Sequence, residues 1–291
     1  MTRVLQSSSI LLWGAACVFA EEITLEGWDD RANAVQTERG QKALEVKGGD
    51  WSHVQSARFV VHAGEAGVAE LTAREAEYYL GEILDSLGLS DFEPKRRAHI
   101  FAFQREEDWK EFTRTAALDP WTGGIFDGVD LFYWRRTGRG GQHSSVALPH
   151  EIAHAALYLK FQFNAFPKAL NEGFAEYESR KLSFKYLRPR GYNVRVESRR
   201  LPRARFFSAT DLLQAKRYPD ADEKIRDFYD ASERLVNFFI ENHDAEKFIE
   251  LLEAIASGKA PADAALKVYD YRGEDELNAA FEEYGLAGEG E

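Results

Sequence analysis

Apolar residues change their spacing along the chain, from short runs in the first half to a helical period in the second. The runs at 57–62, 98–103 and 129–134 predict strands. Apolar positions three and four residues apart predict the following helices: 71–87, 108–115, 148–163, 167–181, 224–242, 245–257, 260–269 and 275–284. Strands followed mainly by helices predict an α+β fold.

Composition is that of an ordinary globular protein. The 291 residues are 44% hydrophobic and 30% charged, which is enough for a sizeable core in one large domain or two tightly packed subdomains. The aromatic share of 13% argues against disorder. The formal net charge of -12 argues against a nucleic-acid partner, because binding to phosphates requires a basic surface.

The first twenty residues have the pattern of an export signal. Arg3 supplies a positive start, 10–20 form a short apolar run, and 18–20 end in a small residue suited to cleavage. The run is shorter than a membrane-spanning helix requires, and a buried N-terminal helix is the alternative interpretation. We therefore expect a signal peptide at 1–20 and an exported protein, periplasmic or extracellular, whose mature chain has no transmembrane span.

Cys17 is the only cysteine, and cleavage after residue 20 would remove it. A thiol-free exported chain fits a bacterial periplasm or surface better than a disulfide-rich exterior. In an alternative interpretation Cys17 is the lipidated residue of a lipoprotein signal. Gly14 is a poor match to the apolar residue that such a signal carries, so this interpretation ranks second.

The stretch 148–154 contains the motif H-E-x-x-H inside an expected helix. Residues four apart on a helix share a face, so His150 and His154 are expected to present two imidazoles to one metal ion. Glu151 follows the first histidine and can reach a metal-bound water without binding the metal itself. Zinc lowers the pKa of such a water to about 7, and a neighbouring carboxylate can then take its proton.

A third ligand is expected from the next helix. Zinc held by two histidines needs another protein ligand, often a carboxylate, so that the fourth position stays open for water. Glu172 lies eighteen positions after His154, within L-N-E-G-F-A-E-Y. This separation leaves room for a turn at 166–167 and an antiparallel return. We therefore expect His150, His154 and Glu172 to bind one metal ion, with Zn²⁺ as the default for this donor set.

The two motifs together resemble those of the gluzincin metallopeptidases. H-E-x-x-H followed by N-E-G-F-A looks most like the bacterial peptidase MA-like domains, whose fold is related to thermolysin and to the M1 aminopeptidases. The resemblance covers roughly 57–285, which would be the catalytic domain, after an N-terminal extension at 21–56. It implies a thermolysin-like zincin with a small N-terminal mixed sheet plus helices and a helical C-terminal subdomain.

The resemblance also implies roles for individual residues. His150, His154 and Glu172 would bind zinc, and Glu151 would be the general base. The group often uses a tyrosine from a later helix to stabilise the oxyanion, and the Y-D-A-S stretch that begins at Tyr229 matches its pattern.

Some of these roles have alternatives. Tyr229 is also explained as a half-buried residue of an amphipathic helix, and Tyr218 and Tyr192 are rivals for its role. Glu176 is expected to orient a ligand histidine from one turn beyond the third ligand, and is otherwise a solvated charge.

The remaining histidines stand singly in the sequence. We expect His53, His62, His99 and His243 to be structural or exposed. His143 follows a glycine-rich loop just before the motif and is a weaker candidate for the site.

Two departures limit what the resemblance implies. The chain has no G-x-M-E-N segment, with which M1 aminopeptidases hold the substrate amine, so aminopeptidase specificity is not carried over. A metzincin is excluded, because Leu157 and Lys160 stand where its glycine and third histidine would be.

The segment 180–217 has the opposite charge to the acidic remainder. It holds twelve lysines or arginines, against the two acids Glu197 and Asp211. It is interpreted either as a solvated arm or as a rim that receives an anionic group of the substrate.

The sequence thus predicts a zinc-dependent metallopeptidase that acts on a peptide or protein. Its substrate would extend along a sheet edge at 123–126 or 129–134. One alternative is a non-catalytic metal-binding pseudopeptidase or scaffold, which the intact Glu151 disfavours. Another is a zinc amidohydrolase that acts on cell-wall peptides. The sequence does not indicate an oligomeric state.

Overall fold

The computed structural model describes residues 23–28, 34–46, 50–90, 93–119, 122–135, 147–161, 166–187 and 206–287. Four sequence predictions fall outside these residues: the signal peptide at 1–20, Cys17, His143 and Tyr192. The middle of the basic segment 180–217, from 188 to 205, also lies outside them.

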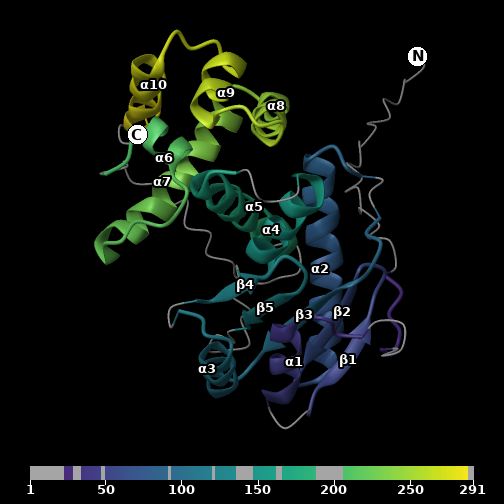
Figure 1. Ribbon diagram of the computed structural model, residues 1–291. Helices are drawn as coiled ribbons and strands as arrows, with labels where there is room; N and C mark the ends of the chain where they lie inside the picture. Colours follow the sequence, from purple (N-terminus) through teal and green to yellow (C-terminus); the bar gives the residue numbers. More distant parts are fainter. Residues whose placement is uncertain are drawn as a thin grey trace, which may run out of the picture.

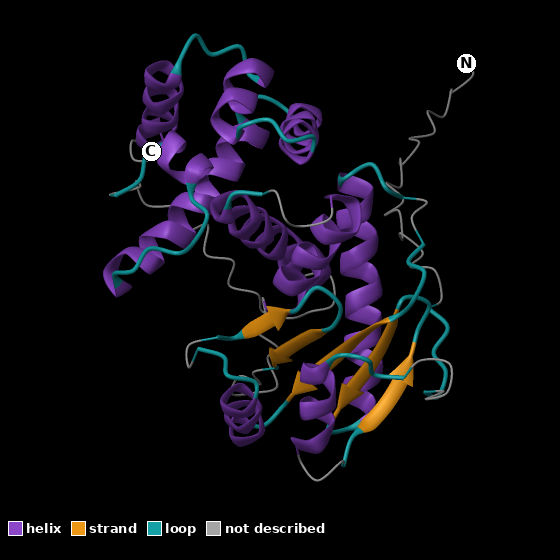
Figure 2. Cartoon of the chain, in the orientation of Figure 1, coloured by secondary structure: helices purple, strands orange, loops and turns teal. Residues whose placement is uncertain are grey.

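The described chain has a sheet in one half and a group of helices in the other (Figure 1). Figure 2 shows its strands together at the lower side of the view, with most of the later helices above them. The predicted α+β class is confirmed at this level.

One mixed sheet holds the strands of the described chain. They are β1 (Ser52–Gln55), β2 (Phe59–Ala63), β3 (Ala98–Phe103), β4 (Gly124–Phe126) and β5 (Leu131–Trp134), in the spatial order β1-β2-β3-β5-β4. The three inner strands run parallel, and the edge strands β1 and β4 run antiparallel to their neighbours. The strands predicted at 57–62, 98–103 and 129–134 are confirmed as β2, β3 and β5. Of the two segments predicted as a sheet edge, 123–126 contains the edge strand β4, whereas 129–134 contains the inner strand β5.

Helices make up most of the remaining structure. In chain order they are α1 (Glu38–Glu45), α2 (Ala66–Ser86), α3 (Glu106–Thr115), α4 (Ala147–Phe161), α5 (Lys168–Leu187), α6 (Ala209–Gln214), α7 (Asp222–Glu241), α8 (Ala245–Ala256), α9 (Pro261–Val268) and α10 (Glu274–Ala287). The helices predicted from the apolar period overlap α2–α5 and α7–α10. The short helices α1 and α6 were not predicted.

Each face of the sheet has its own helical cover, and β3 shows why. Its side chains alternate between the faces. Ile100 and Ala102 join the main core with α2 and α4, which continues into the helical half. Phe101 and Phe103 join a second, aromatic core with α1 and α3. The helix with the H-E-x-x-H motif therefore lies on the main-core face.

Residues before the expected catalytic domain take part in this fold. Strand β1 pairs with β2, and Val35, Ala43 and Trp51 belong to the aromatic core. Thr37 caps α1 and donates a hydrogen bond to the buried Asp130 beside β5. The boundary placed between residues 56 and 57 thus falls between two paired strands.

Three histidines that stand singly in the sequence form a row across β1, β2 and β3. The Nδ1 atoms of His53 and His62 are 2.7 Å apart, and His62 Nε2 is 2.8 Å from His99 Nδ1. His62 and His99 are buried, and the indole of Trp28 lies 4.6 Å from the His53 ring and 5.1 Å from that of His62. The row is thus a polar element of the sheet that is buried at His62 and His99 and partly exposed at His53.

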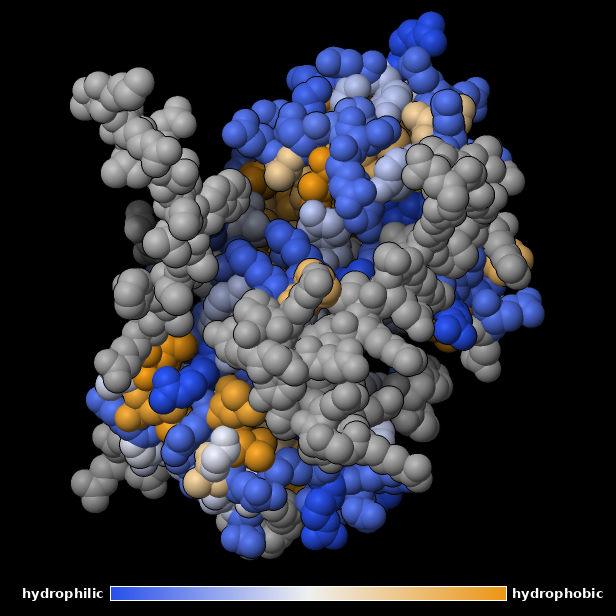
Figure 3. Space-filling view, turned by 180° about the vertical axis from the view of Figure 1, so that it is seen from behind, coloured by the Kyte–Doolittle hydropathy of each residue, from blue (hydrophilic) through white to orange (hydrophobic). Residues whose placement is uncertain are grey.

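The described surface is mainly hydrophilic on the side seen in Figure 3, where apolar residues show in separate patches. Within the described residues, no helix combines the length and apolarity needed to cross a membrane.

Candidate metal centre

The H-E-x-x-H motif lies on α4, a helix that is buried on nearly all sides. It packs against α2, α5 and the strands β4 and β5. The motif therefore places a carboxylate and an imidazole in the interior, where ionisable groups require a partner or a metal ion. Glu151 and His154 are 5% and 8% exposed, and His150 is only slightly more open.

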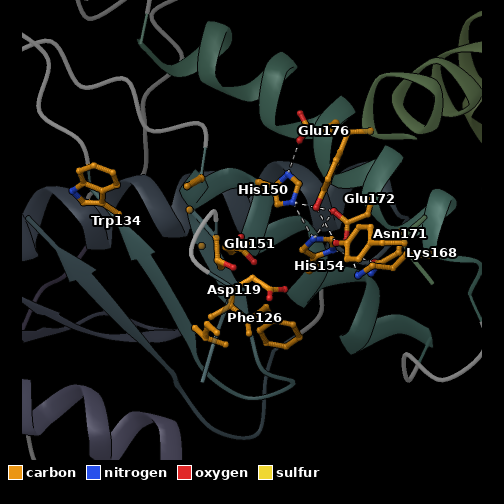
Figure 4. Close-up of a pocket in the computed structure, with 18 of the residues that line it drawn as sticks. Asp119, Phe126, Trp134, His150, Glu151, His154, Lys168, Asn171, Glu172 and Glu176 are labelled. Carbon is orange, nitrogen blue, oxygen red and sulfur yellow. Dashed lines mark hydrogen bonds and ion pairs between the residues drawn. The ribbon is translucent and has the colours of Figure 1, made fainter. Parts of the chain in front are cut away.

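The three predicted ligands converge on one point (Figure 4). The Nε2 atoms of His150 and His154 are 3.1 Å apart, and Glu172 Oε2 lies 3.5 Å and 3.7 Å from them. Ligand atoms on a tetrahedral zinc ion, with bonds of about 2.0–2.2 Å, are separated by roughly 3.3–3.5 Å. The donor set and its spacing therefore fit a divalent metal ion, as the grouping of these side chains within 4.8 Å indicates.

Two neighbours fix the orientation of the imidazoles. His154 Nδ1 is 3.1 Å from Asn171 Oδ1, and His150 Nδ1 is 3.4 Å from Glu176 Oε1. When each Nδ1 carries the proton, each Nε2 lone pair faces the centre. Glu176 is thus where the sequence predicted it. Asn171 was missed, although it stands in the N-E-G motif.

Burial and neighbouring charges shift the pKa values of the three side chains at the centre. Burial lowers the pKa of His154 to about 4. Burial also acts to lower the pKa of His150, but a hydrogen bond to Glu172 and the charges of Glu151 and Glu176 outweigh it and raise this pKa to about 9. Burial opposes ionisation of Glu172, yet the two imidazoles hold its pKa well below the ordinary value. Because a histidine that binds a metal ion must be neutral, metal binding at this centre would release the proton of His150.

Glu151 lies outside the group of three and is held against the edge strand. Its carboxylate accepts a hydrogen bond from the backbone N–H of Phe126, and burial raises its pKa to about 7. A Cβ atom on Gly124 would lie 2.5 Å from Glu151 Oε1. The absence of a side chain at Gly124 therefore makes the space for this carboxylate.

Gly173 sets the position of the third ligand. A Cβ atom at this position would lie 2.1 Å from the backbone oxygen of Ser232 and 2.9 Å from Val236 Cγ2 on α7. The glycine of N-E-G thus allows α5 to lie directly against α7. This close contact fixes the backbone of Glu172 relative to the helix that carries Tyr229.

Two of the three tyrosines considered for the oxyanion role lie at the centre. Tyr218, from the segment between α6 and α7, donates a hydrogen bond of 2.8 Å to Glu172 Oε1. Tyr229, on α7, donates one of 2.9 Å to the Tyr218 hydroxyl. Lys168, one helical turn before the third ligand, places its Nζ 2.8 Å from Glu172 Oε1. Nothing in the sequence indicated a role for Lys168 beyond this i,i+4 spacing.

A cleft of about 690 Å³ runs past the centre. Helices α4, α5 and α7 and the segment before α7 line it with the three ligands, Glu151, Lys168 and the two tyrosines, and the sheet lines it with Trp134 and the edge strand β4. In Figure 4 the ligands point toward one another, with Glu151, Asp119 and Phe126 beside them. The arrangement can hold a cation next to an ionisable carboxylate and an open strand edge.

The chain matches no model of a known protein family, and a search of curated proteins gives no match either.

Proposed function

We propose that the protein is a zinc-dependent metallopeptidase of the gluzincin type, with a thermolysin-like arrangement of sheet, cleft and helices. The observation that carries the proposal is the convergence of His150, His154 and Glu172 beside a separate buried carboxylate in one cleft. A site that only stored metal would not need Glu151. Bound zinc would polarise the scissile carbonyl and lower the pKa of a water molecule.

The remaining chemistry comes from side chains. Glu151, held by the backbone of Phe126, would take the proton of the attacking water and pass it to the leaving nitrogen. Tyr229 lines the cleft, and its hydroxyl would donate to the developing oxyanion once it leaves Tyr218.

The edge strand supplies a place for an extended peptide. Gly123 accepts a backbone hydrogen bond from Trp134, and Asp127 donates one to Asp130, so these residues face the interior of the sheet. Because the bonding side alternates along an antiparallel strand, the backbone groups of Gly124 face the opposite side, toward the cleft. A substrate paired with β4 would therefore pass directly in front of Glu151.

The direct test combines metal analysis with hydrolysis. We expect the purified protein to hold about one zinc ion per chain, to cleave members of a mixed peptide library, and to lose cleavage when a chelator removes the metal. Stoichiometric Zn²⁺ should restore it, and His150→Ala should bind no zinc at the same concentration. A protein without bound metal, or cleavage that survives complete metal removal, would contradict the proposal. Cleavage of purified cell wall alone would point to the amidohydrolase alternative.

The tight fit at Gly124 gives a second prediction. Gly124→Ala should lower kcat by about tenfold or more, because the added Cβ displaces the Glu151 carboxylate, while zinc content stays unchanged. Gly123→Ala is the matched control, since a Cβ there meets nothing within 4 Å. Steady-state kinetics and metal analysis of both variants check this. Equal kcat values for the two alanine variants would show that the position of Glu151 does not limit the reaction.

A further inference from the structure

The two oxygens of the Glu172 carboxylate have different partners. Oε2 faces the two histidines at 3.5 Å and 3.7 Å. Oε1 faces away from them and lies 2.8 Å from both the Tyr218 hydroxyl and the Lys168 ammonium. The side chain is only 3% exposed, so these groups, rather than solvent, set its orientation.

The two donors form one unit. The Lys168 ammonium lies 4.4 Å from the centre of the Tyr218 ring, a cation–π contact. The Tyr218 oxygen accepts the hydroxyl proton of Tyr229, and its own O–H is directed to Glu172. Phe228 lies edge-on against the Tyr218 ring. Tyr229 and Phe228 therefore hold the Tyr218 side chain in place, and its hydroxyl donates to Glu172.

These residues are not ordinary core residues. Lys168 and Tyr218 both line the cleft. The side chain of Lys168 is 29% exposed, and Tyr218 as a whole residue is 36% exposed. A lysine and a tyrosine at a cleft wall have solvent as an alternative partner. Here both are directed at the single oxygen of Glu172 that the histidines do not face.

We propose that Tyr218 and Lys168 are positioning residues that make Glu172 bind the metal through one oxygen. The inference rests on the proposed function only in taking the centre as a metal site. Two donors on Oε1 occupy the lone pairs that bidentate binding would use, so only Oε2 remains for the cation. One coordination position therefore stays open for the reacting water.

Different roles for the two tyrosines follow from this arrangement. Tyr218 acts on the metal through Glu172, whereas the Tyr229 hydroxyl donates to Tyr218 and lines the open cleft. Loss of the Tyr218 hydroxyl should change how the metal is held. Loss of the Tyr229 hydroxyl should mainly change the turnover of substrate and lower the metal affinity much less, because Tyr218 keeps its own O–H for Glu172.

The test measures Zn²⁺ affinity by competition with a fluorescent chelator, without any substrate. We expect Tyr218→Phe and Lys168→Met each to weaken Zn²⁺ binding by about 10–100-fold, the usual effect of losing a group that orients a ligand. Lys168→Arg should keep most of the natural affinity, and Tyr229→Phe should weaken Zn²⁺ binding clearly less than Tyr218→Phe does. In the double variant, X-ray absorption should detect one additional oxygen neighbour of the zinc, from bidentate Glu172.

The outcomes separate this inference from the proposed function. Natural affinity in both Tyr218→Phe and Lys168→Met, with circular dichroism showing a folded chain, would overturn the positioning role while leaving hydrolysis untouched. A chain that binds zinc in the predicted order of affinities but cleaves no peptide would contradict the peptidase and leave the positioning role standing. If one of these two variants fails to fold, the Zn²⁺ affinity of the other still tests the positioning role, because each variant removes one of the two donors to Glu172.

Discussion

Replacing Glu151 with glutamine is expected to reduce peptide hydrolysis by about 10²–10⁴-fold while the zinc stays bound. Glutamine keeps the size of the side chain and an oxygen that can accept the N–H of Phe126, so the fold of the cleft should not change. It has no carboxylate to take the proton of water. The measurement is kcat/KM on a cleaved library peptide, with zinc content determined on the same preparations.

Glu107→Gln is the matched control for this substitution. The Glu107→Gln substitution makes the same change of charge on α3. The Glu107 side chain is exposed there, and its Oε2 lies 3.7 Å from Arg105 Nε. It should hydrolyse peptides at the natural rate. If Glu151→Gln retains the activity of this control, the carboxylate takes no part in chemistry, and the metal-binding scaffold becomes the better interpretation.

Lowering the pH from about 6.5 to about 4 is expected to remove about 3 kcal/mol of folding free energy through His99 alone. Burial lowers the pKa of His99 to about 4, against 6.5 in an unfolded chain. Above pH 6.5 His99 is neutral in both the folded and the unfolded chain, and its full contribution to the free energy of unfolding is present. As the pH falls, the unfolded chain takes up a proton that the folded chain does not, so the contribution is lost between these two values. Burial lowers the pKa of His62 in the same direction.

The measurement is a difference between variants, because buried acids act in the opposite sense. Burial raises the pKa of Asp130, whose carboxylate accepts the backbone N–H of His99. Urea unfolding of the natural chain and of His99→Gln at pH 7 and pH 4.5 isolates the histidine. The glutamine variant should lose markedly less stability on acidification, whereas His243→Gln, in the helical half, should follow the natural chain more closely. An identical pH dependence in His99→Gln would show that His99 is protonated equally in the folded and unfolded chains.

The grouping of the three side chains at the candidate metal centre could be predicted from sequence because their spacing is local. His150, Glu151 and His154 lie on one helix, so the helical period alone places the imidazoles together. Glu172 required only a short connection between two helices that both showed a clear apolar period. The structure has these helices as α4 and α5, and it brings Glu172 to the two rings.

Other parts of the site depend on contacts between distant segments. Tyr218 reaches Glu172 across 46 positions of the chain, and no local pattern encodes that approach. The role of Gly124 depends on where α4 lies against β4. The histidine row was missed for a similar reason, since strand register alone brings His53, His62 and His99 together. Each histidine by itself fits a structural position, as was expected.

The N-terminal elements α1 and β1 were difficult to predict from sequence for a different reason. Residues 21–56 are polar and rich in turn-forming residues, so neither α1 nor β1 has a strong period of its own. The four residues of β1 are ordered by pairing with β2, and α1 is anchored through Thr37 to Asp130. Tertiary partners outweighed local preference here.

The contact between Gly173 and α7 explains why the glycine of the N-E-G motif indicates a close packing of α5 against α7. Because even a methyl group at this position would overlap the backbone of Ser232, a chain with a larger residue there must hold its two helices farther apart. Such a chain would carry its acidic ligand and its tyrosines at a different separation. Among sequences that share H-E-x-x-H, this glycine therefore distinguishes those in which the acidic ligand and the tyrosine pair can meet as they do here.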